Sequence, residues 1–317
     1  MNDILKLLSK SLRPFGYHVR KYKAPNILRL PALERTEQDA SALNLPKVTG
    51  NGFFPKDSDL ASMVIFVRTC IRENRNIDKT KRVTKVTLEE NTKRCLFSLL
   101  KSISHAQESN KNRIIKLICL DDHSDEPFRQ ALENIIAKAP CEHEFRKTSD
   151  TGQGKSLHEQ FQLGSKENAL VYFCEDDYLH EIDAIDACWN FYERIAHELE
   201  THSVIYPQEH AALYSDHYPS YILLGEDRKW RTIRHATHTF ITHGKVVEKF
   251  WPFFENTKFV GDRKNRKKGS EAYTTNQLFE KIPGFSPMVP AAVHLQFEET
   301  LPPLYDWKSL WESNKTL

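Results

Sequence analysis

The sequence predicts an α/β protein in which helices surround an open sheet. Three apolar runs have the length and β-branched content of buried parallel strands, at residues 63–67, 114–120 and 169–174. Segments with helical spacing of apolar residues alternate with them, at residues 88–104, 128–139, 156–165 and 182–199. A regular alternation of strands and helices is typical of an open α/β sheet.

Length and composition limit the kinds of protein this can be. The 317 residues suit one large domain with an appendage, or two small domains, and a 39% hydrophobic content supports a sizeable core. The formal net charge of +2 argues against a nucleic-acid partner. No apolar run reaches the roughly 18 residues of a membrane span. Residues 1–8 are interrupted by Asp3 and Lys6, so no signal peptide is expected.

The first 60 residues differ from the rest. Residues 1–23 combine leucines and isoleucine at helical spacing with six Lys and Arg side chains. Such an amphipathic segment can lie on an anionic membrane surface, or it can pack on the body of the protein, and both interpretations stay open. Residues 24–60 contain four prolines and little periodicity, which predicts an extended linker. We therefore divide the chain into residues 1–60 and a main domain over 61–317.

The cysteine pattern bears on the compartment. The six cysteines are scattered and none forms a CxxC pair, so neither a zinc knuckle nor a disulfide framework is indicated. Buried free thiols are typical of a reducing cytoplasm. We expect a cytoplasmic protein, peripheral on the inner membrane face if residues 1–23 bind lipid.

Polar side chains follow all three predicted strands. Ligands of open α/β sheets bind outside the carboxyl ends of the strands. Mg²⁺ and Mn²⁺ take oxygen ligands, usually one or two carboxylates plus substrate phosphates. The sequence therefore predicts a phosphate-bearing ligand and a divalent cation at the strand ends, which are Arg68-Thr69, Asp121-Asp122 and Glu175-Asp176-Asp177.

Residues 62–200 resemble the nucleotide-binding half of GT-A glycosyltransferases, especially those of family 2. The resemblance rests on an apolar strand with a polar end, an Asp-Asp turn, a glycine-containing segment before a helix, and an acidic motif after the third strand, at residues 64–69, 120–125, 151–156 and 173–179. Two positions depart from the family pattern. His123 stands where the turn usually has glycine, and Cys174 replaces the first Asp of the usual Asp-x-Asp.

The resemblance implies a GT-A fold, a Rossmann-like mixed sheet flanked by helices. Residues 61–200 would form the nucleotide-binding half and residues 201–317 the acceptor-side half. It implies a nucleotide-sugar donor, preferably a UDP-sugar, a glycan or lipid-linked acceptor, and Mn²⁺ or Mg²⁺. The metal ligand would be Asp177, with Asp176 as second choice. The residues expected around the donor are Arg68, Thr69, Asp121, Asp122, Lys155, Glu175 and Asp176.

Two residues compete for the role of general base, which an inverting transfer requires beside the acceptor hydroxyl. Family 2 enzymes take the base from an acid at the start of a downstream helix. Glu271 opens a predicted helix that runs to Glu280, and Asp262 is the competitor. In the alternative interpretation Glu271 is a first-turn acid that stabilises the helix dipole.

Three further residues complete the candidate site. GT-A enzymes often complete the metal shell with a C-terminal histidine, which is here His294, although a lone histidine is more often structural. Tyr214 and Trp230 lie among polar neighbours and suit an acceptor sugar, but core packing explains Trp230 equally well. The basic run Arg263–Lys268 is either a solvated loop or a lid over an anionic substrate.

Two other functions compete with sugar transfer. A nucleotidyltransferase acting on sugar phosphates would have a glycine-rich basic loop after the first strand, and residues 68–72 contain no glycine. A non-catalytic carbohydrate-binding relative would keep the fold, but the complete set of acidic residues argues against it.

Overall fold

The computed structural model describes residues 53–72, 83–209, 212–215 and 220–315, together with Ser11, Leu12 and Pro14. Contacts divide the chain into residues 1–50 and residues 51–317. The basic segment expected over residues 1–23 lies outside the described residues except for those three positions.

The end of the expected linker is part of the main domain. Phe53 donates its N–H to Thr201 Oγ1 at 3.1 Å and accepts from His202 N at 2.9 Å. The ring of Phe54 packs edge-on against His202, with centroids 5.0 Å apart. Phe53 and Phe54 are therefore packed on the main domain, because their rings bury apolar surface that the proline pattern did not indicate.

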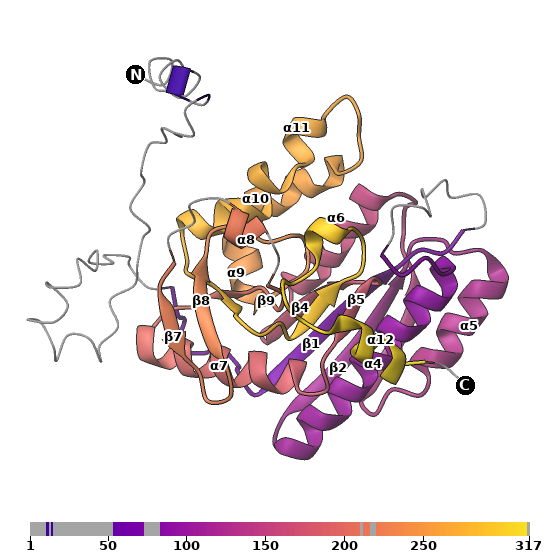
Figure 1. Ribbon diagram of the computed structural model, residues 1–317, viewed down its shortest axis with the longest axis horizontal. Coiled ribbons are helices and arrows are strands. Elements are labelled where there is room, and N and C mark those ends of the chain that lie inside the picture. Colours follow the sequence, from indigo (N-terminus) through magenta and orange to yellow (C-terminus); the bar gives the residue numbers. More distant parts are fainter. Residues whose placement is uncertain are drawn as a thin grey trace, which may run out of the picture. The chain divides into compact units, whose positions relative to one another are not determined.

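The described residues form a mixed sheet in the order β3-β2-β1-β4-β9-β6-β10-β8-β7 (Figure 1). Its parallel part is β1 (Ser62–Thr69), β2 (Ile114–Asp121), β3 (Glu142–Lys147) and β4 (Leu170–Glu175). The other part is β9 (Phe240–His243), β6 (Val204–Ile205), β10 (Gly284–Pro287), β8 (Lys229–Ile233) and β7 (Ile222–Leu224). β9 is antiparallel to β4 and begins the mixed half.

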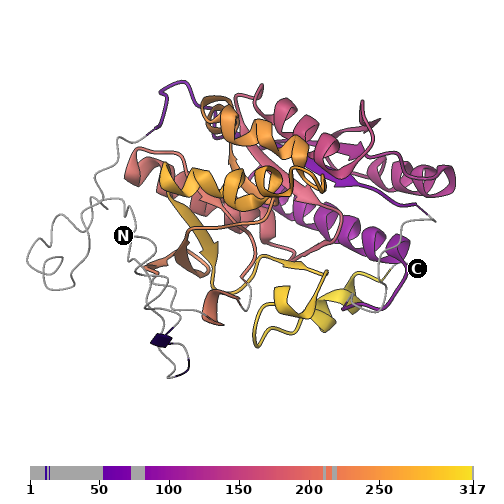
Figure 2. The same ribbon diagram turned by 90° about the horizontal axis from the view of Figure 1, so that it is seen from above.

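Helices cover both faces of this sheet, as Figure 2 shows. Along β1, Met63, Ile65 and Val67 enter one apolar cluster, whereas Val64 and Phe66 enter the other. This alternation is the two-residue period of a strand that is buried on both faces. The first cluster includes α4 (Leu88–Ser109), α5 (Glu126–Ile136) and α7 (Ala184–Leu199). The second includes α6 (Gln153–Gly164), α9 (Gly244–Lys249) and α10 (Trp251–Glu255).

A two-stranded ribbon and several short helices complete the domain. The ribbon pairs β5 (Tyr178–His180) with β11 (Ala292–His294) in antiparallel orientation. The short helices are α8 (Ala212–Ser215), η2 (Asn256–Phe259), α11 (Arg266–Gly269), η3 (Glu271–Tyr273), η4 (Thr275–Glu280), η5 (Glu298–Thr300) and α12 (Trp307–Ser313). Within the described ranges, no helix combines the length and apolar character that crossing a bilayer requires.

The structure confirms the strands and helices that were predicted up to residue 199 and differs at three elements. The short strand β5 was not predicted, because it has only three residues. β3 was not predicted, because Glu142–Lys147 is a charged, partly exposed edge strand without an apolar run. The helix expected over residues 271–280 consists of two 3₁₀ turns, η3 and η4, separated at Thr274, whose φ of −121° and ψ of −109° are not helical. The six cysteines are free thiols, as expected.

Candidate active site

The ends of three neighbouring strands place the expected side chains next to one another. β1 lies between β2 and β4, so Thr69 is opposite Asp121 and Arg68 is opposite Glu175. The guanidinium of Arg68 forms an ion pair with the Glu175 carboxylate, and the Arg68 side chain is only 7% exposed. The shared register therefore gathers a basic and two acidic strand ends at one edge of the sheet.

The carboxylate of Asp121 holds the turn that follows β2. It accepts hydrogen bonds from Ser124 N at 3.0 Å, from Ser124 Oγ at 2.5 Å and from Thr69 Oγ1 at 3.2 Å. The turn requires a left-handed residue, and His123 adopts φ = 57° there. This is the position at which the resembling family has glycine, the residue that adopts such a left-handed backbone most readily.

Asp122 connects the end of β2 to the start of α6. Its Oδ1 accepts from Gly152 N at 2.9 Å and from Arg72 Nη2 at 3.2 Å. Asp121 and Asp122 are both buried, at 0% and 2% exposure. In this structure both carboxylates accept hydrogen bonds from the protein's own turns, and the expected contact of Asp121 with the donor stays a prediction.

The acidic turn after β4 links three elements. Asp176 Oδ2 accepts from Cys70 N at 3.1 Å, which joins this turn to the end of β1. Asp177 Oδ1 lies 3.3 Å from His294 Nε2, on β11. The His294 ring stacks on Tyr178 with centroids 4.6 Å apart, and Leu295 donates its N–H to Asp177 O at 2.9 Å. The β5–β11 ribbon thus brings the two expected metal ligands together.

The donor atoms of this pair suit a divalent cation. A carboxylate oxygen and an imidazole nitrogen are competent ligands for Mn²⁺, and such ions usually keep further positions for water and phosphate. Among the described residues no group of three or more His, Cys, Asp and Glu side chains is arranged to hold a metal.

Glu271 lies beside a histidine that was not among the residues expected at the site. Glu271 Oε1 is 3.9 Å from His238 Nδ1. His238 is only 5% exposed, and burial lowers its pKa, although the charges of Glu271 and Glu175 act in the opposite direction. The His238 imidazole therefore feels the charges of both the Arg68–Glu175 pair and the first of the two candidate bases.

The other candidate base and the expected Lys155 are directed at local partners. Asp262 accepts from Lys264 N and Asn265 Nδ2, both at 2.8 Å, and the Asn265 hydrogen bond is the main cause of its lowered pKa. Lys155 is 57% exposed and pairs with Asp150 at 3.4 Å. Both side chains bind neighbours in their own segments, whereas Glu271 lies beside His238.

The two acceptor-side candidates differ in exposure. Tyr214 is 53% exposed, donates its hydroxyl to Glu209 and has the Arg231 guanidinium 5.2 Å from its ring centroid. Trp230 is 1% exposed and stacks on Phe191 with centroids 4.0 Å apart. The burial of Trp230 favours the alternative interpretation, core packing, and its expected contact with an acceptor stays a prediction.

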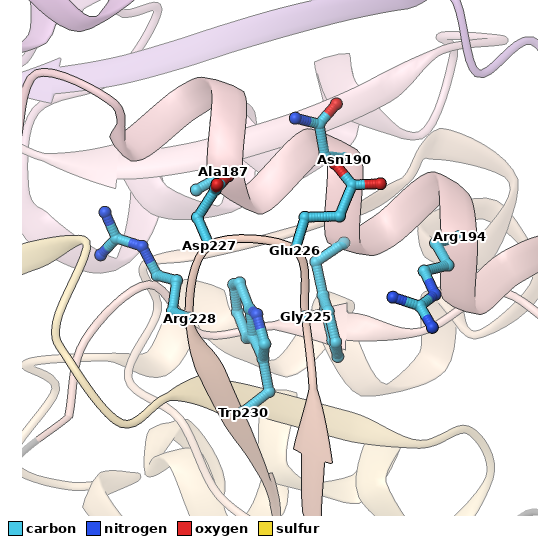
Figure 3. Close-up of a pocket in the computed structure, with 9 residues that line it drawn as sticks. Ala187, Asn190, Arg194, Gly225, Glu226, Asp227, Arg228 and Trp230 are labelled. Atoms are coloured by element: carbon cyan, nitrogen blue, oxygen red, sulfur yellow. The ribbon is translucent and has the colours of Figure 1, made fainter.

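A separate hollow lies between α7 and the hairpin that joins β7 to β8 (Figure 3). Of the expected site residues, only Trp230 lines it. Its Arg228 is held by Asp183 and by the carbonyl oxygens of Val289 and Pro290, each at 3.1 Å. The basic side chain is therefore already neutralised, and the hollow is not part of the strand-end site.

Three residues of the site were missed in the sequence. His238 lies just before β9, and the only signal was a histidine next to an apolar run. Gln208 is fully buried and its Oε1 accepts from His294 N at 3.0 Å, which no local pattern reveals. Arg72 donates Nε to His123 O at 3.0 Å, and a basic residue soon after the first strand could have indicated it.

A mixed α/β sheet with basic and acidic strand ends gathered at one edge defines a GT-A-type fold. The chain belongs to glycosyl transferase family 2, whose family model matches residues 83–285. The matched region contains the Asp121–Ser124 turn, the acidic turn and Glu271, whereas β1 precedes it. No curated protein matches the chain.

Several solved structures are similar to this chain at low identity. One is S. aureus TarS 1–349 in complex with UDP-GlcNAc, with 12% identity, a TM-score of 0.40, and coverage of 71% of this chain and 58% of that one. A UDP-glucose pyrophosphorylase complexed with UDP-glucose has 13% identity, a TM-score of 0.41, and coverage of 80% and 97%. HddC from Yersinia pseudotuberculosis has 11% identity, a TM-score of 0.40, and coverage of 80% and 98%. The match spans less than two thirds of the TarS chain.

Proposed function

We propose that this protein transfers a sugar from a nucleotide-sugar, preferably a UDP-sugar, to a glycan or lipid-linked acceptor, with a divalent cation and with inversion. The observation that supports it most is the pairing of Asp177 with His294 beside the ends of β1 and β4. That pair offers one carboxylate and one imidazole at the edge where open α/β sheets bind ligands.

The Asp177–His294 pair would hold the cation, preferably Mn²⁺, at the acidic turn. When bound, the cation would neutralise charge on the diphosphate leaving group. Arg68, Thr69 and Glu175 would line the donor pocket from the strand ends. Asp121 and Asp122 would act indirectly, by stabilising the turns that border the nucleotide.

Glu271 would remove the proton of the acceptor hydroxyl. The acceptor oxygen would then attack the anomeric carbon on the face opposite the diphosphate, and the bond from that carbon to the diphosphate oxygen would break. The proton would go to the carboxylate and the bonding electron pair to the nucleoside diphosphate. A single displacement of this kind inverts the anomeric configuration. The half-exposed carboxylate of Glu271 supports this role, because a base must reach the acceptor.

The test is a transfer assay over a panel of nucleotide-sugars and glycan acceptors, with Mn²⁺ or with a chelator. We expect Mn²⁺-dependent release of UDP from one donor, and a glycosidic product of inverted anomeric configuration by NMR. The matched assay for the nucleotidyltransferase alternative supplies UTP and a sugar 1-phosphate and measures pyrophosphate. Pyrophosphate release without sugar transfer would replace the proposed function with that alternative.

A further inference from the structure

A strongly basic loop, residues 261–268, borders the candidate site. It exposes Arg263, Lys264, Lys267 and Lys268. The carboxylate of Asp262 is held by Lys264 N and Asn265 Nδ2 of the same loop. Among the described residues, no carboxylate lies in a salt bridge with any of these four cations. The loop therefore carries a net positive charge.

The loop has a defined shape. The Lys267 ammonium lies 5.2 Å from the ring centroid of Tyr273, and the Lys268 ammonium lies 5.5 Å from that of Phe259. Gly269 packs so closely on the backbone that an added Cβ would lie 2.4 Å from the carbonyl carbon of Phe259. Figure 1 shows α11 and this loop projecting beyond α6 and α10. The charges are therefore displayed on a folded surface.

Both ends of the loop are attached to the walls of the site. Before it, the carbonyl oxygens of Lys258 and Val260 lie 2.6 Å from an added Cβ at Gly154, so this segment is pressed against the first turn of α6. The same turn holds Asp122 through Gly152 N. After the loop comes Glu271, 3.9 Å from His238. Along the chain, the four cations thus lie between a segment packed on α6 and the proposed base.

We propose that this loop binds the acceptor, and that the acceptor is an anionic saccharide with phosphate, sulfate or carboxylate groups near the reacting hydroxyl. The inference rests on the proposed function, because it takes Glu271 as the base. When the acceptor hydroxyl is bound at Glu271, the neighbouring groups of the saccharide lie against the basic loop, which ends three residues before Glu271. Tyr273 is 47% exposed beside these cations, and an aromatic ring among charged donors suits a charged sugar.

The test compares two variants that remove the same charge. The loop variant carries Arg263→Gln, Lys264→Gln, Lys267→Gln and Lys268→Gln. The control variant carries Lys56→Gln, Lys111→Gln, Lys138→Gln and Lys166→Gln, which change exposed lysines that precede β1, β2, β3 and β4 at the amino edge of the sheet. Binding is measured for short dextran sulfate, uncharged dextran, UDP with Mn²⁺, and vesicles containing anionic phospholipid.

We expect the loop variant to bind dextran sulfate about tenfold or more weakly, since several exposed charge contacts are lost. The control variant should change by less than about twofold, and wild-type binding should weaken with salt. UDP affinity should be unchanged in both variants. Equal losses in the two variants, a loss of UDP affinity confined to the loop variant, or loop-dependent binding of the vesicles in place of the saccharide would each overturn the inference. Failure of wild-type protein to bind UDP would instead refute the proposed function.

Discussion

The imidazole of His294 lies 3.3 Å from the carboxylate of Asp177, although the two residues belong to distant parts of the chain. The antiparallel pairing of β5 with β11 sets His294 opposite Tyr178, the neighbour of Asp177. Tyr178 supports the imidazole by stacking, and Gln208 accepts a hydrogen bond from the His294 backbone. We propose that the cation and the diphosphate bind beside this contact.

Substitutions at Arg68 and Glu175 should have strongly coupled effects on folding stability, because the two side chains form an ion pair. Each partner of this pair is largely buried, so Arg68→Met or Glu175→Gln alone leaves a polar group without its partner and should cost about 3 kcal/mol. The double variant should lose clearly less than the sum of the two. Urea unfolding of the four proteins measures the coupling, and additive losses would show that the pair does not act as a unit.

His123 should tolerate glycine better than a β-branched residue. Its φ of 57° costs an ordinary residue about 1 kcal/mol or more, a cost that glycine avoids, although glycine also loses more entropy on folding. We expect His123→Gly to change the unfolding free energy by less than about 1 kcal/mol, and His123→Val to lower it by about 2 kcal/mol. Equal effects in chemical denaturation would contradict the left-handed turn.

Acid should destabilise the domain through two stacked histidines. The rings of His202 and His243 lie 4.4 Å apart, and burial lowers the pKa of His202 to about 3 and that of His243 to about 4. Below an unfolded pKa of about 6.5 the unfolded chain binds protons that the folded chain does not. Stability should therefore be full above this pH and fall toward pH 4, by about 1.4 kcal/mol per pH unit for each ring.

The measurement is urea unfolding between pH 4 and pH 8. The variant His202→Gln/His243→Gln should show a shallower slope with pH, and His143→Gln, at an exposed position, should keep the wild-type slope. An unchanged slope in the double variant would mean that both imidazoles are already protonated in the folded protein.

Substitutions of Glu271 and of Asp262 should have different effects on kcat. Glu271→Gln should lower kcat by about 10²–10⁴-fold, because the carboxylate would accept the acceptor proton, while UDP binding stays unchanged. Asp262→Asn should keep kcat within about twofold, since this side chain serves its own loop. Steady-state kinetics and UDP titration check both. The opposite ranking would transfer the base role to Asp262.

The sequence predicted the parallel half of the fold because its signals are local. The strands ending at Thr69, Asp121 and Glu175 are apolar runs with polar ends, and each is found where expected. The edge strand Glu142–Lys147 carries no such run and was missed. The helix expected from Glu271 fails because Thr274 leaves the helical region, which composition alone does not indicate.

The sequence indicated which residues lie at the site better than it indicated the role of each residue. Asp177 and His294 are in fact close together. The hydrogen bonds from Ser124 to the carboxylate of Asp121 are a feature of the folded turn that the sequence did not indicate, and the expected place of Asp121 at the donor stays a prediction. His238 and Gln208 act through contacts across the fold, so spacing along the chain gives no sign of them.

The most direct test of the account is the binding of UDP with and without Mn²⁺ to wild-type protein and to Asp177→Ala, followed by thermal unfolding. A ligand that binds only the native state stabilises it, by about 2.7 kcal/mol at a hundred times its Kd. We predict that UDP raises the Tm of the wild-type protein only when Mn²⁺ is present, and that Asp177→Ala abolishes this rise. A Mn²⁺-dependent rise of the same size in Asp177→Ala would contradict the account.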